Sequence, residues 1–270
     1  MTKKTFFILF VVLFLTGILT SNANANHSWN GYHWARTGNP FTLKLGDNVS
    51  SLWDNYLGVA STDWTLSSVL NTTIVSGLGG KNCKPSAGRV EVCNKKYGNN
   101  GWLGIAQIWV NGSHITQAVT KMNDTYFNLK TYNTPAWKQF VVCQEIGHTF
   151  GLDHQDENFS NANLGTCMDY TNDPDGTIRG QMDNKHPNQH DYDMLETIYA
   201  HLDSFSTLLG KIGKTPSASI LVEKVDDNID ISNSSEWGKV IRKGSDGRSS
   251  LHERDLGKGN KVFTFVIWAE

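Results

Sequence analysis

The chain has 270 residues, 39% hydrophobic and 19% charged, which is typical of one or two globular domains and argues against a disordered or fibrous protein. Its formal net charge is only −2 and its lysines form no long run, so we expect no nucleic acid partner and no electrostatic attachment to an anionic membrane.

The first 25 residues are typical of an export signal. Lys3 and Lys4 precede an apolar run from Phe6 to about Leu19, and Ala23-Asn24-Ala25 fits a small-x-small cleavage site. The run is shorter than the roughly 18 to 20 residues that span a bilayer, although an uncleaved anchor is the alternative. We therefore expect a signal peptide at 1–25 and a secreted, extracellular protein with no membrane contact after cleavage.

The next hundred residues are predicted to be mainly strands. Alternating apolar residues and β-branched runs predict strands over 40–49, 71–80, 89–93, 101–110 and 114–123. The run 101–110 is apolar enough to be a buried strand, whereas 114–123 is predicted to be an edge strand that receives an extended peptide by strand addition. One helix is predicted after Ser50 or Ser51, where apolar residues over 52–57 recur at helical spacing.

Two longer helices are predicted in the second half. Pro135 fits a first helical turn, and apolar residues then recur at helical intervals up to Gly151. A turn-rich stretch follows, and 188–202 is predicted to be a helix with Asn188 or Asp191 near its start.

The tail carries weaker signals. Residues 211–216 are predicted to be a linker, 218–225 a strand-like run and 237–242 a possible helix. A glycine turn at 257–260 lies between two strand-like runs and predicts a hairpin.

Four cysteines in an exported protein favour two disulfides, for which three pairings are possible. Local spacing suggests Cys83 with Cys93, which leaves Cys143 with Cys167. The second disulfide would close a loop, and the chain-entropy model gives it a stabilisation of about 3 to 4 kcal/mol. Buried free thiols are the alternative.

The stretch CQEIGHTFGLDH, residues 143–154, carries the candidate chemistry. On a helix, Gln144 and His148 are i and i+4, so they share one face, with Glu145 beside them. Gly151 can end the helix in a left-handed conformation and return His154 toward the same point. Such a set suits a metal with an attached water and a carboxylate that takes the proton of that water.

This pattern resembles the metzincin metallopeptidases, whose signature HExxHxxGxxH is followed by a methionine turn. Four of five signature positions match, Gln144 being the departure, and Met168 and Tyr170 stand in the turn. The resemblance extends loosely over 41–202. It implies an α+β fold with a twisted mixed sheet, an edge strand, an active-site helix, the methionine turn and a C-terminal helix. This domain would span 26–210, with a small β-rich extension at 217–270.

The resemblance also implies a secreted zinc endopeptidase. Zn²⁺ would be held by Gln144, His148 and His154, with Glu145 as general base and Tyr170 as a second catalytic residue that steadies the transition state. Gly151, Met168 and the cysteines would be structural. The partner would be a protein or peptide substrate along the edge strand near 112–117, and we expect a monomer.

Other interpretations stay open. A carboxamide oxygen is a poorer zinc ligand than an imidazole, so a catalytically inactive metzincin-fold module that binds peptides or proteins is the main alternative. A functional tail carried by the first domain is another. His186 or His190 could replace the missing imidazole, whereas the histidines His27, His33, His114, His201 and His252 show no ligand spacing. Residues 172–176 could bind Ca²⁺ weakly, although a simple turn is the plainer interpretation.

Overall fold

A computed structural model describes residues 26–209 and 232–269. The predicted signal peptide, the linker at 211–216 and the strand-like run at 218–225 lie outside the described residues, as does the proposed boundary between 210 and 217. Within the described ranges, no helix combines the length and apolar character needed to cross a membrane.

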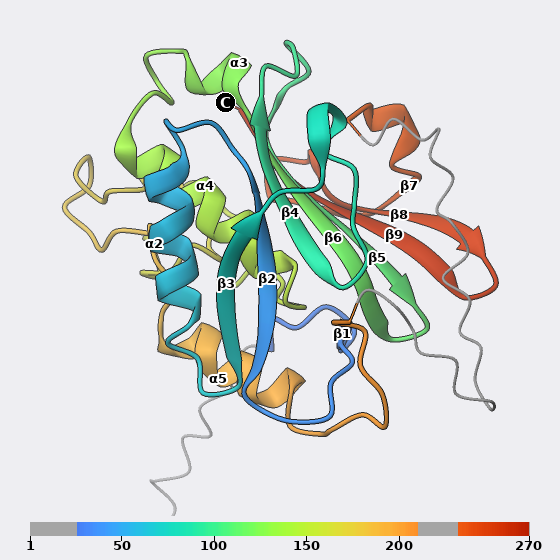
Figure 1. The fold of residues 1–270 in the computed structure, drawn as a ribbon. Helices are drawn as coiled ribbons and strands as arrows, with labels where there is room; N and C mark the ends of the chain where they lie inside the picture. Colours follow the sequence, from blue (N-terminus) through green and yellow to red (C-terminus); the bar gives the residue numbers. More distant parts are fainter. Residues whose placement is uncertain (1–25, 210–231, 270) are drawn as a thin grey trace, which may run out of the picture.

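The strands join in one mixed sheet in the order β3-β2-β4-β6-β5-β9-β8-β7, with β1 paired to β6 (Figure 1). The described strands are β1 His33–Trp34, β2 Phe41–Asn48, β3 Leu70–Ser76, β4 Arg89–Lys95, β5 Trp102–Asn111, β6 His114–Asn123, β7 Lys239–Lys243, β8 Ser249–Gly257 and β9 Asn260–Trp268. The α-helices are α2 Asp54–Trp64, α3 Asp124–Phe127, α4 Pro135–His148 and α5 Gln189–Ile198, with 3₁₀ turns at Gly80–Asn82 and Ser234–Glu236. The fold is therefore mixed α+β.

The half of the sheet from β3 to β6 is parallel, and the half from β6 to β7 is antiparallel. Alternation along β5 sends Ile108 and Val110 into the main core and Trp109 to the opposite face, where it packs near the Cys83–Cys93 disulfide. Helices α2 and α4 pack on each other and on the main-core face, which places α4 against β5 and β6 (Figure 1).

The helix ends follow their capping residues. The Thr134 side chain accepts a hydrogen bond from the Trp137 backbone N–H, and Pro135 occupies the first turn of α4. Asn188 and Asp191 form a reciprocal capping box at the start of α5. Both predicted starts are confirmed, although α5 ends at Ile198, before the predicted 202.

The tail continues the sheet. β9 pairs with β5 in antiparallel register from Trp102 opposite Trp268 to Asn111 opposite Asn260, and the hairpin predicted around 257–260 is confirmed as β8 and β9. Figure 1 shows the tail strands running beside β5 and β6. The division into two domains stays a prediction, but the last strands of the chain and the first half share one set of backbone hydrogen bonds.

Three predictions were wrong. The strand at 114–123 is no edge strand, because β6 lies between β4 and β5, so residues 112–117 offer no free edge of the kind expected for a peptide. Residues 237–242 form no helix but enter β7, where pairing with β8 overrides local propensity. The helix expected after Ser50 or Ser51 is confirmed as α2, but its predicted start was wrong, because it begins only at Asp54 with no side-chain cap and Leu52 is exposed.

Candidate functional site

The C-terminal half of α4 carries three of the predicted site residues. Gln144, Glu145 and His148 are all buried, and Gln144 and His148 share the helix face predicted from their spacing. Glu145 lies against β5, because a Cβ added at Gly104 would stand 2.6 Å from its Oε1. Glu145 of α4 therefore lies against Gly104, the β5 residue that pairs with Ile267 of β9.

Gly151 turns the chain after the helix, as predicted. Its φ of +96° is a conformation that favours glycine, and an added Cβ would lie 2.2 Å from the Tyr32 carbonyl oxygen. The turn brings His154 back so that its Nε2 lies 2.9 Å from His148 Nε2. The sequence and the structure therefore agree on how these two rings meet.

The hydrogen bonds of the two rings assign their tautomers. His148 Nδ1 lies 2.9 Å from the Leu152 carbonyl oxygen, and His154 Nδ1 lies 2.7 Å from a Glu157 carboxylate oxygen, so each Nδ1 donates. Burial lowers the pKa of His148 well below its usual value and lowers the pKa of His154 to about 3, so both rings are neutral near pH 7. Two Nε2 lone pairs therefore face each other, and a shared cation would relieve their repulsion.

Gln144, on the same helix face as His148, has a buried oxygen of its own. Its Nε2 donates to the Cys167 carbonyl oxygen at 2.8 Å, which fixes the amide and leaves Oε1 buried without a hydrogen-bond partner. Glu145 is more exceptional, because both of its oxygens are buried without a partner. Burial raises the pKa of Glu145 well above its ordinary value. Uncompensated buried oxygens of this kind are rare in structural roles and common where a ligand or reactant binds.

These donors fit a zinc ion. His148 and His154 each offer Nε2, with Nδ1 bonded to a carbonyl or a carboxylate oxygen, and Gln144 offers an amide oxygen without a partner. Two nitrogens on one tetrahedral zinc are separated by about 3.3 Å, close to the 2.9 Å between the facing nitrogens. Among the described residues, His154 also belongs to a group of three with Asp153 and Glu157, whose ligand atoms lie within 4.8 Å of one another.

Met168 and the second disulfide support the helix from below. A Cβ added at Gly147 would lie 2.5 Å from Met168 Sδ, so the methionine packs directly under α4. Cys143 is bonded to Cys167, and Cys83 to Cys93, with no free cysteine among the described residues. The pairing suggested by local spacing is confirmed.

Tyr170 lies beside His154, with 4.4 Å between ring centroids, but its hydroxyl is already engaged. It donates to the Val266 carbonyl oxygen of β9 at 2.9 Å. The neighbouring Phe265 stacks on His148 with 4.0 Å between centroids and 10° between planes. The tail strand therefore covers the two histidines and holds the tyrosine.

A charged contact joins the tail to the same place. Arg242 of β7 binds the Asp153 carboxylate through both terminal nitrogens, and its Nε lies 2.8 Å from the Glu157 oxygen that also accepts from His154. Ser250 adds a hydrogen bond of 3.0 Å to the other Glu157 oxygen. Asp153, His154 and Glu157 form a cluster that could hold a metal ion, and the Arg242 guanidinium supplies the positive charge beside its two carboxylates.

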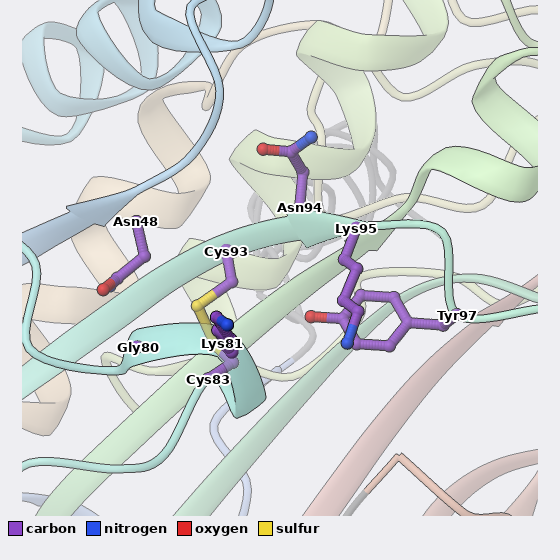
Figure 2. Close-up of a pocket in the computed structure, with 8 residues that line it drawn as sticks. All are labelled: Asn48, Gly80, Lys81, Cys83, Cys93, Asn94, Lys95 and Tyr97. Atoms are coloured by element: carbon purple, nitrogen blue, oxygen red, sulfur yellow. A yellow bond between two sulfur atoms is a disulfide. The ribbon is translucent and has the colours of Figure 1, made fainter.

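One open pocket in the described part of the chain lies away from α4. A hollow of about 280 Å³ on the far side of the sheet from α4 is built around the Cys83–Cys93 disulfide, with Asn48 on one side and Lys95 and Tyr97 on the other (Figure 2). It contains the predicted structural cysteines but none of the predicted catalytic or metal-binding residues. The candidate residues on α4 are instead covered by β9, whose Phe265 stacks on His148.

Some functional neighbours were missed by sequence analysis. Glu157 follows His154 by three residues, and that spacing could have marked it as the partner of the ring. Phe265 and Arg242 carry no local signal, since only strand pairing brings them to α4. His186 binds Asp63 of α2 at 2.7 Å and His190 stacks on His27, so neither takes the place of the absent imidazole. Residues 172–176 contain a turn closed by the Gly176 N–H and the Asp173 carbonyl, and calcium binding stays a prediction.

No protein-family model matches the chain, and no curated protein matches it by sequence. Among solved structures, it is similar to high choriolytic enzyme 1, a hatching-enzyme zinc protease from the medaka fish Oryzias latipes, at 10% sequence identity and a TM-score of 0.36. That match covers 64% of this chain and 96% of the other.

Proposed function

We propose that this chain is an exported, zinc-dependent peptidase of metzincin type whose substrate cleft is closed by its own C-terminal strand. Zinc would be held by Gln144, His148 and His154. The order of elements from β2 through α4 and Met168 to α5 supports the metzincin assignment, and the two disulfides support export to an oxidising compartment.

The observation that carries the proposal is the pair of facing Nε2 atoms. Their 2.9 Å separation, with both Nδ1 atoms donating elsewhere, leaves no proton between the rings at neutral pH. A hydrogen-bonded core histidine pair would share one. The orphaned Gln144 Oε1, one helical turn away from His148, supplies the third donor.

When bound, zinc would polarise a scissile carbonyl and lower the pKa of an attached water to about 7. Glu145 would take the proton of that water and return it to the leaving amine, a role suited to a buried carboxyl whose pKa is raised. The Tyr170 hydroxyl would donate a hydrogen bond to the oxyanion once it no longer donates to the Val266 carbonyl oxygen. Glu157 would orient His154 through Nδ1.

A protein or peptide substrate would take the place of β9 on β5. β9 is itself an extended chain that pairs antiparallel with β5 and places Phe265 against His148. A bound peptide would pair with β5 in the same way. The same observation favours a second candidate function, a peptide-binding module without catalysis. The monomeric state and the absence of nucleic acid partners are part of the proposal.

Metal analysis joined to a peptidase assay separates the candidates. Full-length protein should contain zinc that is lost in His148→Ala, and Glu145→Gln should keep this zinc while activity falls at least about 100-fold. Zinc that survives His148→Ala unchanged would refute the site. Inert wild type with an active Gln144→His variant would identify the second candidate as the present function.

A further inference from the structure

Three histidines and one aspartate meet at a second place, where distant parts of the chain converge. His33 belongs to β1 and His114 begins β6, and the two are opposed in the parallel pairing of these strands. His201 and Asp203 follow α5. None of them belongs to the α4 site, and nothing in the sequence spacing joins them.

Their donor atoms surround a single carboxylate oxygen. Asp203 Oδ1 lies 3.2 Å from His114 Nε2, 3.6 Å from His33 Nε2 and 3.7 Å from His201 Nε2. His33 Nε2 and His201 Nε2 are 3.1 Å apart. These separations bracket the roughly 3.3 Å between two ligand atoms on one tetrahedral zinc. The ligand atoms of His33, His201 and Asp203 all lie within 4.8 Å of one another, while His114 reaches the group only through the aspartate.

The outer contacts orient these donors inward. His33 Nδ1 donates to the Gly31 carbonyl oxygen at 2.7 Å, so the other ring nitrogen, Nε2, faces the group. The buried Arg36 donates through its backbone N–H and its Nη1 to Asp203 Oδ2, at 3.2 and 2.9 Å. Oδ1 is thereby left to face the histidines. Arg36 is itself fixed by the Tyr199 carbonyl oxygen at 2.8 Å.

We propose that His33, His201 and Asp203 form a zinc site with three protein donors, and that His114 supports it through its hydrogen bond to Asp203. Two imidazole nitrogens and one carboxylate match the donors that zinc prefers. The ion would tie β1 to the segment after α5, so its binding would stabilise the fold. His201 is 54% exposed, which gives the ion a path from solvent.

A network of shared protons is the competing explanation for the same geometry. His201 can donate to His33, and His114 to Asp203, without any ion. The two explanations differ in their response to zinc, because a proton network gains nothing when zinc is added.

The test uses the full chain with two histidine variants. His201→Ala removes an exposed ligand, and His186→Ala is the matched control, since His186 is also about half exposed and binds one aspartate but faces no second histidine. We expect His201→Ala to lose one equivalent of zinc and to weaken zinc binding at this site more than about 100-fold, since losing even an outer-shell partner costs 10- to 100-fold. His186→Ala should lose none.

Thermal unfolding with and without added zinc gives a second readout. The zinc-dependent increment in Tm should vanish in His201→Ala and persist in His186→Ala. The proposal is overturned if wild type and His201→Ala hold the same zinc and show the same increment. A His148→Ala variant measured alongside removes only the equivalent assigned to the α4 site, so the two proposals can fail separately.

Discussion

Replacing Arg242 with glutamine should loosen the tail strand that covers the candidate site. Arg242 is the tail's charged link to the segment after α4, where it binds Asp153 and Glu157. The substitution keeps a polar side chain of moderate length but removes the charge. It leaves two carboxylates close together without their cation.

The magnitude follows from the contacts. A hydrogen bond to a charged group contributes about 1.5 to 3 kcal/mol when shielded, but Arg242 is 31% exposed, so solvent screening reduces the value for the whole cluster to about 2 kcal/mol. Because 1.4 kcal/mol is a factor of ten, tail opening should become about 30-fold more frequent.

Hydrogen exchange at the backbone amides of β9 measures this opening, and the amides of β2 serve as an internal reference. Arg254→Gln is the matched control, because Arg254 is also 31% exposed but binds Glu236 within the tail. We expect exchange in β9 to rise about 30-fold in Arg242→Gln and little in Arg254→Gln, with β2 unchanged in both.

Peptide hydrolysis should rise by the same factor if tail opening limits access to the site. Equal acceleration in β2 and β9 would mean general destabilisation and would refute the assigned role of Arg242. So would equal exchange in the two variants. Faster exchange in β9 without any gain in hydrolysis would support the role of Arg242 in holding the tail strand. It would also favour the peptide-binding module over the peptidase.

Gly151→Ala should destabilise the protein by more than about 2 kcal/mol in urea unfolding, because its Cβ would lie 2.2 Å from the Tyr32 carbonyl oxygen at a φ of +96°. Gly112→Ala, at a φ of +58° with open space around it, should cost only the conformational strain of about 1 kcal/mol, and equal costs would contradict the role of close approach. The hydrogen bond to Asp63 raises the pKa of His186 above its ordinary 6.5, so this pair stabilises the fold below about pH 6.5 and loses that effect as the pH rises through the raised value. His186→Gln should therefore lower the unfolding free energy by less than about 1 kcal/mol at pH 5.5 and not at pH 9, and a loss of the same size at both values would exclude the ion pair as its cause.

Local signals predicted most elements and both rings of the candidate site. Thr134 and Pro135 mark the start of α4 because capping depends on nearby backbone groups, and Gly151 marks the turn because few other residues adopt its φ. The spacing of His148 and His154 around that turn was therefore sufficient to place them together.

Strand order and long-range contacts were beyond the sequence. β6 is as buried as β5 although it carries polar side chains such as Gln117 and Lys121, so its polar composition did not mark a sheet edge. The pairing of β9 with β5 joins residues 149 to 166 positions apart, and its register decides that Phe265 meets His148. The convergence of His33, His114 and His201 has the same origin, since parallel pairing of β1 with β6 is a non-local event.

Gln144 shows how a departure visible in sequence acquires meaning only in the structure. A ligating histidine presents one nitrogen inward and donates its other N–H to an acceptor outside the site. The Gln144 amide divides its two atoms in the same way, donating Nε2–H to the Cys167 carbonyl and leaving Oε1 free. The acceptor is fixed by the disulfide from Cys167 to Cys143, the neighbour of Gln144. A histidine at 144 could donate to the same carbonyl, so Gln144→His tests the proposed metal site without removing the support beneath it.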